Sequence, residues 1–178
     1  GLHAELMALL RGLAPADWSR PTACALWSVK DITAHLLDTT LRRLSFGRDG
    51  LETAPDTAIS GYSDLVAYLN RLNAEWTTAT RRLSPPVLID LLDFTSGQVH
   101  AFFQSLDPHS PARFPVSWAG EDVSPNWFDI GREYTERPRP HRTGVASSHS
   151  RYLCARASIR VPGGGGTGGL PCPLRDRR

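Results

Sequence analysis

The stretch from Trp27 to Asp38, WSVKDITAHLLD, constrains the fold more than any other part of the chain, because it carries a complete helix start signal. Ser28 is a favoured N-cap residue, and Asp31 three positions later completes the capping box. Trp27 and Ile32 occupy the staple positions on either side of this cap, which sets the angle at which the chain enters the helix. The sequence therefore predicts a helix that starts at this cap.

The helix that follows this signal is predicted to have one core-facing stripe. It should run from about Val29 to Phe46, with Gly47 as its C-cap. His35 lies beside the stripe, and such a histidine is either a satisfied polar group of the core or a ligand. The stripe itself consists of residues that recur at helical spacing: Val29, Ile32, Leu36 and Thr39.

Three further segments have the periodicity of long amphipathic helices. Leucines at helical spacing predict a first helix that ends between Gly12 and Pro15. Ser63 is expected to cap a third helix, whose apolar residues keep the near-heptad spacing of a bundle seam. Pro85 and Pro86 open a fourth helix, where proline is tolerated in the first turn. Its predicted buried stripe is Leu88, Leu91, Leu92, Val99, Phe102, Phe103 and Leu106.

The segment after the fourth helix is predicted to be a small hairpin or ordered loop over residues 108–125. Asn126 then caps a last helix that should stop near Arg137, because Pro138 and Pro140 disfavour its continuation. Four long helices with two longer connections imply an all-α four-helix bundle that carries this hairpin or loop as an insertion. The face of the last helix that is expected to pack carries Trp127, Ile130 and Tyr134.

Charge is divided unevenly along the chain of 178 residues. Residues 1–136 carry 11 basic and 17 acidic side chains, whereas residues 137–178 carry nine Arg, five Pro and one acid. A segment so poor in apolar residues cannot offset its ordering entropy. We therefore predict a helical domain over residues 1–137 and a disordered tail over residues 138–178. The tail has no interleaved aromatic residue beyond Tyr152 and no recognition fold, so specific nucleic-acid binding is not expected.

Cysteine usage and hydropathy indicate a cytoplasmic protein. The three cysteines lack C-x-x-C spacing, which argues against a disulfide scaffold or a structural zinc site and suits a reducing compartment. Cys24 is either a reactive thiol or, by default, a small and partly buried apolar residue. No apolar run reaches membrane-spanning length, so no membrane partner is expected.

Two separated motifs carry a family resemblance. The first, from Asp17 to Asp38, has the pattern DW-x-x-PT-x(4)-WSVKDI-x-AHLLD, and the second, from Ser117 to Arg137, reads SWAGEDVSPNWFDIGREYTER. Both resemble the DinB-like, mycothiol-dependent maleylpyruvate isomerase family. Together with the helices between them, the resemblance covers about residues 1–137 and implies a DinB-like bundle.

The resemblance also implies a divalent metal site, with zinc as the expected metal. Its ligands would be a His on the second helix, here His35, and a Glu-x-x-x-His pair on the last helix, whose Glu is Glu136. Pro140 stands where that pair has its His, and His141 is then the nearby substitute for the third ligand. Two explanations of this break remain open, namely a frame-shifted C-terminus or a degenerate relative that no longer needs the metal.

The cofactor that the resemblance implies is mycothiol, a small-molecule thiol. A metal lowers the pKa of a bound thiol, and the resulting thiolate adds to an electrophilic double bond. The expected activity is therefore that of an isomerase or a thiol transferase, with an electrophilic substrate as the second partner. The alternative is a non-catalytic DinB-like bundle that has lost its third metal ligand. Bundles of this kind often pair, so a homodimer is a further expectation.

Overall fold

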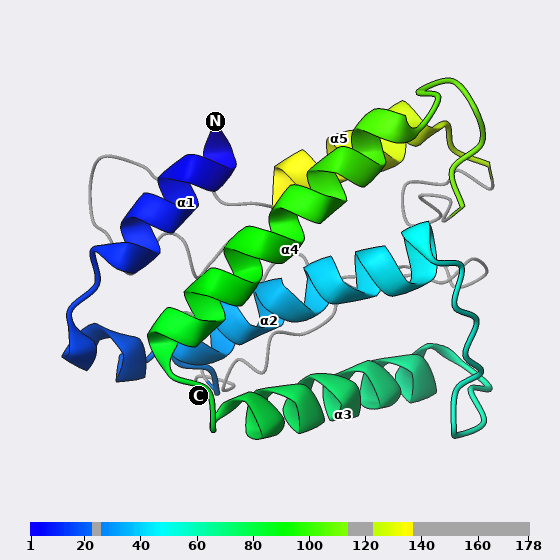
Figure 1. The fold of residues 1–178 in the computed structure, drawn as a ribbon. Helices are drawn as coiled ribbons and strands as arrows, with labels where there is room; N and C mark the ends of the chain where they lie inside the picture. Colours follow the sequence, from blue (N-terminus) through cyan, green and yellow to red (C-terminus); the bar gives the residue numbers. More distant parts are fainter. Residues whose placement is uncertain (23–25, 114–122, 137–178) are drawn as a thin grey trace, which may run out of the picture.

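The computed structural model describes residues 1–22, 26–113 and 123–136, and these residues contain helices but no β-strand. The all-α prediction is confirmed (Figure 1). A 3-10 helix, Pro15–Ser19, follows the first helix. The predicted tail over residues 138–178 lies outside the described residues. The α-helices are α1 (Leu2–Arg11), α2 (Val29–Arg42), α3 (Tyr62–Thr80), α4 (Pro85–Ser105) and α5 (Asn126–Glu136).

The core lies where α2 and α4 meet. Helix α2 packs against both α4 and α3, and α1 packs against α4 (Figure 1). Trp18 of the 3-10 helix is buried in the core, and this short helix packs against α2, so the connector also contributes to the core. The core cluster consists of Leu6, Met7, Leu10, Trp18, Ala34, Leu37, Leu88, Ile89 and Leu92.

The start of α2 is the predicted capping box. The backbone N–H of Asp31 donates to Ser28 Oγ at 3.2 Å, and the backbone N–H of Ser28 donates to Asp31 Oδ2 at 2.9 Å. These bonds satisfy donors that a helix N-terminus otherwise leaves unpaired. The local sequence therefore fixes the point at which the helix begins.

The predicted core-facing stripe of α2 is confirmed at Ile32, which is buried, and at Val29 and Leu36, which pack against the core cluster, but it leaves out two buried threonines. Thr33 and Thr40 are buried, whereas Val29, Leu36 and Thr39 are only partly buried. Thr33 donates to the Val29 carbonyl at 3.0 Å and Thr40 to the Leu37 carbonyl at 2.8 Å. Because each hydroxyl finds an acceptor within its own helix, these threonines enter the core without an unpaired donor.

The predicted C-cap at Gly47 is also wrong. Helix α2 gives way at Arg43 to a π-helical turn that ends at Arg48, and Gly47 lies inside this turn. Gly50 adopts the left-handed conformation instead, with φ of 72°. Packing explains Gly47, because a Cβ there would lie 3.2 Å from Phe102 Cε1. The glycine permits a close approach between the turn and α4.

Helix α3 begins before the predicted cap. Gly61 occupies the N-cap position, so Ser63 lies in the first turn of the helix and does not cap it. The backbone N–H of Ser60 donates to Asp64 Oδ2 at 3.0 Å, which ties the preceding loop to this first turn. The start of α3 is therefore held by a carboxylate that reaches back, a contact that the cap prediction did not include.

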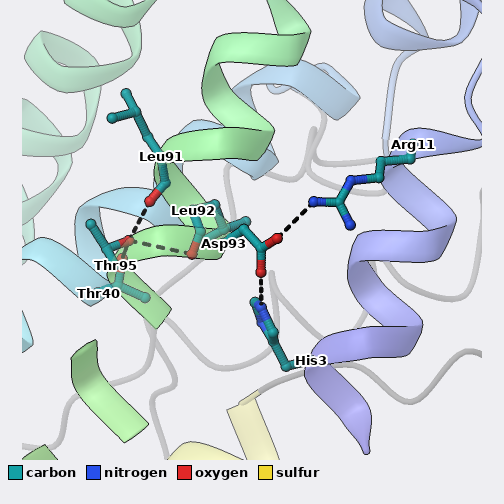
Figure 2. Close-up of polar contacts among 7 residues, drawn as sticks. All are labelled: His3, Arg11, Thr40, Leu91, Leu92, Asp93 and Thr95. Carbon is teal, nitrogen blue, oxygen red and sulfur yellow. Dashed lines mark hydrogen bonds and ion pairs between the residues drawn. The ribbon is translucent and has the colours of Figure 1, made fainter. Parts of the chain in front are cut away.

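The inner face of α4 differs from the prediction at Leu91, which is 40% exposed. Thr95 occupies an inner position and shares a hydrogen bond of 2.9 Å with Thr40 of α2, as Figure 2 shows. On another side of α4, Asp93 accepts hydrogen bonds from His3 at 2.7 Å and Arg11 at 2.6 Å (Figure 2). These bonds lower the pKa of Asp93 and fasten α1 to α4.

Helix α5 is anchored by polar side chains. Asn126 donates through Nδ2 to the Asp107 carbonyl at 2.8 Å, which places the start of α5 at the C-terminal end of α4. Arg43 pairs with Asp129 through two bonds of 2.9 and 3.2 Å, with both side chains only 9% exposed. Trp127 is 55% exposed, so the predicted packing face is wrong at that residue. The aliphatic and aromatic pattern did not indicate that a buried ion pair holds α5.

The predicted insertion lies partly outside the described residues, which exclude 114–122. At its base, an antiparallel bridge joins Pro111 and Pro125. The backbone N–H of Ala112 donates to the Ser124 carbonyl at 2.7 Å. The two described ends of the segment are therefore held side by side, as a hairpin or closed loop requires.

Candidate functional site

The candidate site is centred on His35, in the middle of α2. The ring of Trp27 lies against the imidazole, with centroids 4.9 Å apart and the planes tilted by 50°. The side chain of Asn73, on α3, makes a hydrogen bond with His35. The imidazole is therefore held between the residue that precedes the cap of α2 and a polar group of the neighbouring helix.

The register of α2 against α3 is set one residue away from His35. Trp76 donates through Nε1 to the carbonyl of Ala34 at 2.7 Å. Trp76 lies three positions after Asn73, so both residues share one face of α3. The bond from Trp76 therefore determines which residue of α3 stands opposite His35.

The environment of His35 favours the neutral imidazole. Burial, reinforced by the positive charge of Arg42, lowers the pKa of His35 from 6.5 to about 4, against the opposing effect of the hydrogen bond with Asn73. At neutral pH the ring is uncharged, with one nitrogen that donates and one that carries a lone pair. Such a ring is able to accept a hydrogen bond or to bind a metal.

An ion pair continues the same face of α2. Arg42 lies seven residues after His35 and bonds Asp38 Oδ2 through Nη2 at 2.9 Å. Burial raises the pKa of Asp38, although the charge and hydrogen bond of Arg42 oppose this change. In the described part of the chain, Arg42 Nε is buried and has no hydrogen-bond partner. The rest of the guanidinium is paired with Asp38 or exposed, since the Arg42 side chain is 38% exposed.

Helix α5 runs back along the bundle in the direction opposite to α2 (Figure 1). The ion pair between Arg43 and Asp129 fixes where the two helices meet. Glu136 lies seven residues beyond Asp129, a helical rise of about 10 Å, and His35 lies eight residues before Arg43, about 12 Å along α2. Measured along the axis of the bundle, the backbone at the end of α5 therefore returns toward the position of His35.

The structure describes only some of the predicted site residues. His35 is fully described, Glu136 is described as the last backbone position of α5, and His141 and Cys24 lie outside the described residues. Within residues 1–22, 26–113 and 123–136, no group of three His, Cys, Asp or Glu side chains is placed to hold a metal ion. The chemistry of His35 fits a single metal ligand, since its ring is neutral and one of its nitrogens carries a lone pair.

Two features around His35 were missed by sequence reasoning. Asn73 lies in the third predicted helix next to Leu72, one of the apolar residues at near-heptad spacing, and a polar residue at such a place can be read from the sequence. Asp38 and Arg42 have the i, i+4 spacing of a helical ion pair, which is also readable from sequence. Neither signal indicates that the residues gather beside His35, because that depends on how α2 and α3 pack.

Comparison with known families gives one match. Residues 1–135 match the family model described as the mycothiol maleylpyruvate isomerase N-terminal domain. No curated protein sequence and no solved structure matches the chain significantly. No helix among the described residues is long and apolar enough to cross a membrane. The family match includes the capping box, His35 and nearly all of α5, and the chain therefore belongs to the mycothiol maleylpyruvate isomerase N-terminal domain family.

Proposed function

We propose that this chain is a metal-dependent, mycothiol-using domain with isomerase or thiol transferase activity, and that His35 is a ligand of its metal. Zinc is the proposed metal, because imidazole and carboxylate ligands suit it. The observation that carries the proposal is the state of His35, a neutral imidazole held in place by Trp27 and Asn73. Glu136 and His141 are proposed as the other ligands.

The path of α5 supports the inclusion of Glu136. The ion pair between Arg43 and Asp129 anchors α5 near the end of α2, and the helix then runs back toward the level of His35. A carboxylate on a facing helix is the usual partner of a histidine in a bundle metal site. His141 follows Glu136 by five residues and is the next histidine along the sequence.

A bound divalent cation would supply one property, a lower pKa of a thiol, so that the thiol would release its proton near neutral pH. The thiolate would add to a conjugated double bond to give an enolate. This enolate would either expel the thiolate after bond rotation, which gives the isomer, or take up a proton, which gives the thiol adduct. The residues around His35 would serve this chemistry in different ways. Trp27 covers one face of the imidazole and so limits access of water. Arg42 places a positive charge nearby, which favours an anionic ligand.

The first test is metal content per chain, measured on protein purified without chelators or a metal-affinity tag. We expect near-stoichiometric zinc or another divalent metal in the wild type and loss of that metal in His35→Ala. His100→Ala is the matched control, because His100 is an exposed histidine on α4, and it should retain the metal. Metal that persists in folded His35→Ala would refute the assignment of His35.

The second part of the test is thiol dependence. The metal-loaded wild type, incubated with mycothiol and a cis-configured conjugated acid such as maleylpyruvate, should give isomerised product or a thiol adduct. The same reaction without thiol should give neither. A folded, metal-loaded protein that shows no thiol-dependent turnover would count against the activity while leaving the metal site in place.

The competing function is that of a non-catalytic bundle, and a specific observation favours it. Pro140 stands four residues after Glu136, where the metal pattern of the family places a histidine, and the family match ends at residue 135. A site with two ligands rarely holds zinc against water. Absence of metal from a folded and helical wild type would favour this second function.

A further inference from the structure

We propose that α5 is a separate cooperative unit of the fold, which opens away from the bundle while the core of α1, α2 and α4 stays folded. An ion pair and a few hydrogen bonds hold α5 in its closed position. The inference does not depend on a metal at His35. Glu136, the last residue of α5, moves with this unit, so the opening of α5 controls how much of the time the end of the helix is close to the bundle.

The apolar core does not include the described part of α5. The residues of the core cluster come from α1, the 3-10 helix, α2 and α4. Side chains of α5 are described for residues 126–131. Among them, Trp127 is 55% exposed, and Phe128 and Ile130 are only partly buried. When these residues leave the bundle, the core cluster keeps all its members, so the opening of α5 exposes much less apolar surface than global unfolding does.

The buried side chains in residues 126–131 are polar. Asp129 is 6% exposed and Asn126 is 7% exposed. Asp129 accepts two hydrogen bonds from Arg43, at 2.9 and 3.2 Å. When α5 opens, both charges return to water, and the hydration that they regain offsets much of the lost attraction. The ion pair therefore fixes the position in which α5 closes more than it resists opening.

Other contacts of α5 lie at its start. Asn126 Nδ2 donates to the Asp107 carbonyl at 2.8 Å. The backbone N–H groups of Asn126 and Trp127 donate to the carbonyls of Ser110 and Pro108, each at 2.9 Å. Each of these bonds contributes little net free energy, because water replaces it in the open state. A helix of 11 residues is also marginal by itself in water, so α5 should lose its helical structure when it opens.

Native-state hydrogen exchange of the full chain, followed by NMR, measures the opening of each helix. After correction for intrinsic rates, we expect the amides of α5 to exchange together, at least about tenfold faster than the slowest amides of α2 and α4. The amides of Asn126 and Trp127 should belong to the same group, since their bonds tie α5 to the preceding segment. Equal protection of α5 and the core, or exchange confined to the last turn of α5, would overturn the proposal.

Ile89→Val separates the opening of α5 from global unfolding. Ile89 is a core residue on α4, so its truncation destabilises the closed and the open forms equally. Exchange through global unfolding should accelerate by about 2–10-fold, whereas exchange in α5 should not change. An equal acceleration in α5 would show that this helix opens only when the whole chain unfolds, which would overturn the proposal.

Asp129→Asn tests the ion pair itself. The substitution keeps the shape of the side chain but leaves the charge of Arg43 without this carboxylate in the closed form, so exchange in α5 should accelerate at least about tenfold. Asp90→Asn is the matched control, because Asp90 is an exposed aspartate on α4, and it should leave exchange in α5 unchanged. Exchange in α5 at the wild-type rate in Asp129→Asn would overturn the assignment of the ion pair as the contact that holds α5 closed.

Discussion

Replacement of His35 by a group that does not titrate should remove a defined part of the pH dependence of stability. The folded protein holds the pKa of His35 near 4, against 6.5 in an unfolded chain. That difference corresponds to about 3 kcal/mol in favour of the neutral ring. The sign follows from proton uptake: between these two values the unfolded chain binds more protons, so stability is complete above about pH 6.5 and falls as the pH decreases toward 4.

The decrease is large enough to measure. When the pH is lowered from about 7.5 to about 5, His35 should reduce the free energy of unfolding by about 2 kcal/mol. Urea unfolding, followed by far-UV circular dichroism in the presence of a chelator, gives the free energy of unfolding at each pH. The carboxylates titrate in both proteins, so the comparison of wild type with His35→Gln isolates the imidazole.

The result that would refute this reasoning is the same pH dependence in the two proteins. His35→Gln is expected to change the absolute stability at pH 7.5, but that change is not the measured quantity. If the difference between the two proteins stays constant from pH 7.5 to 5, His35 is not held neutral by its surroundings. The basis for treating it as a ready metal ligand would then be lost.

Two further predictions concern the packing of α5 and α4. Asp129→Ala should lower the free energy of unfolding by about 3–5 kcal/mol, because it leaves the buried charge of Arg43 without this carboxylate. The double variant Arg43→Met/Asp129→Leu should recover much of that lost stability. Equal losses of stability in the two variants would contradict this explanation. Gly97→Ala should raise stability by about 0.5–1 kcal/mol, since the residue is exposed inside α4 and a Cβ there meets no atom within 4 Å. A lower melting temperature for Gly97→Ala would show that this glycine has a role that helix propensity does not describe.

The sequence predicted the elements that depend on local chemistry. The capping box at Ser28 and Asp31 requires only residues three positions apart, and it was confirmed at that position. The proline pair that opens α4 likewise follows from the backbone preferences of single residues. The family, too, is recognisable from two short motifs, which the match over residues 1–135 confirms.

Other features depend on which helix faces which, and periodicity does not contain that information. Thr40 is buried where Thr95 of α4 stands opposite it, and a Cβ at Gly47 would lie only 3.2 Å from Phe102 Cε1. The ion pair between Arg43 and Asp129 joins residues 86 positions apart. No local rule selects these two among all the charges of the chain.

In the candidate site, too, some features follow from local sequence and others from the packing of helices. The sequence by itself determined that His35 lies on a well-started helix beside the core stripe, and it left open whether the ring is a core group or a ligand. Tertiary structure alone decided that Asn73 of α3 lies beside that ring. The physical reason is that the charge state of an imidazole depends on its burial and on its neighbours, and these come from two packed helices.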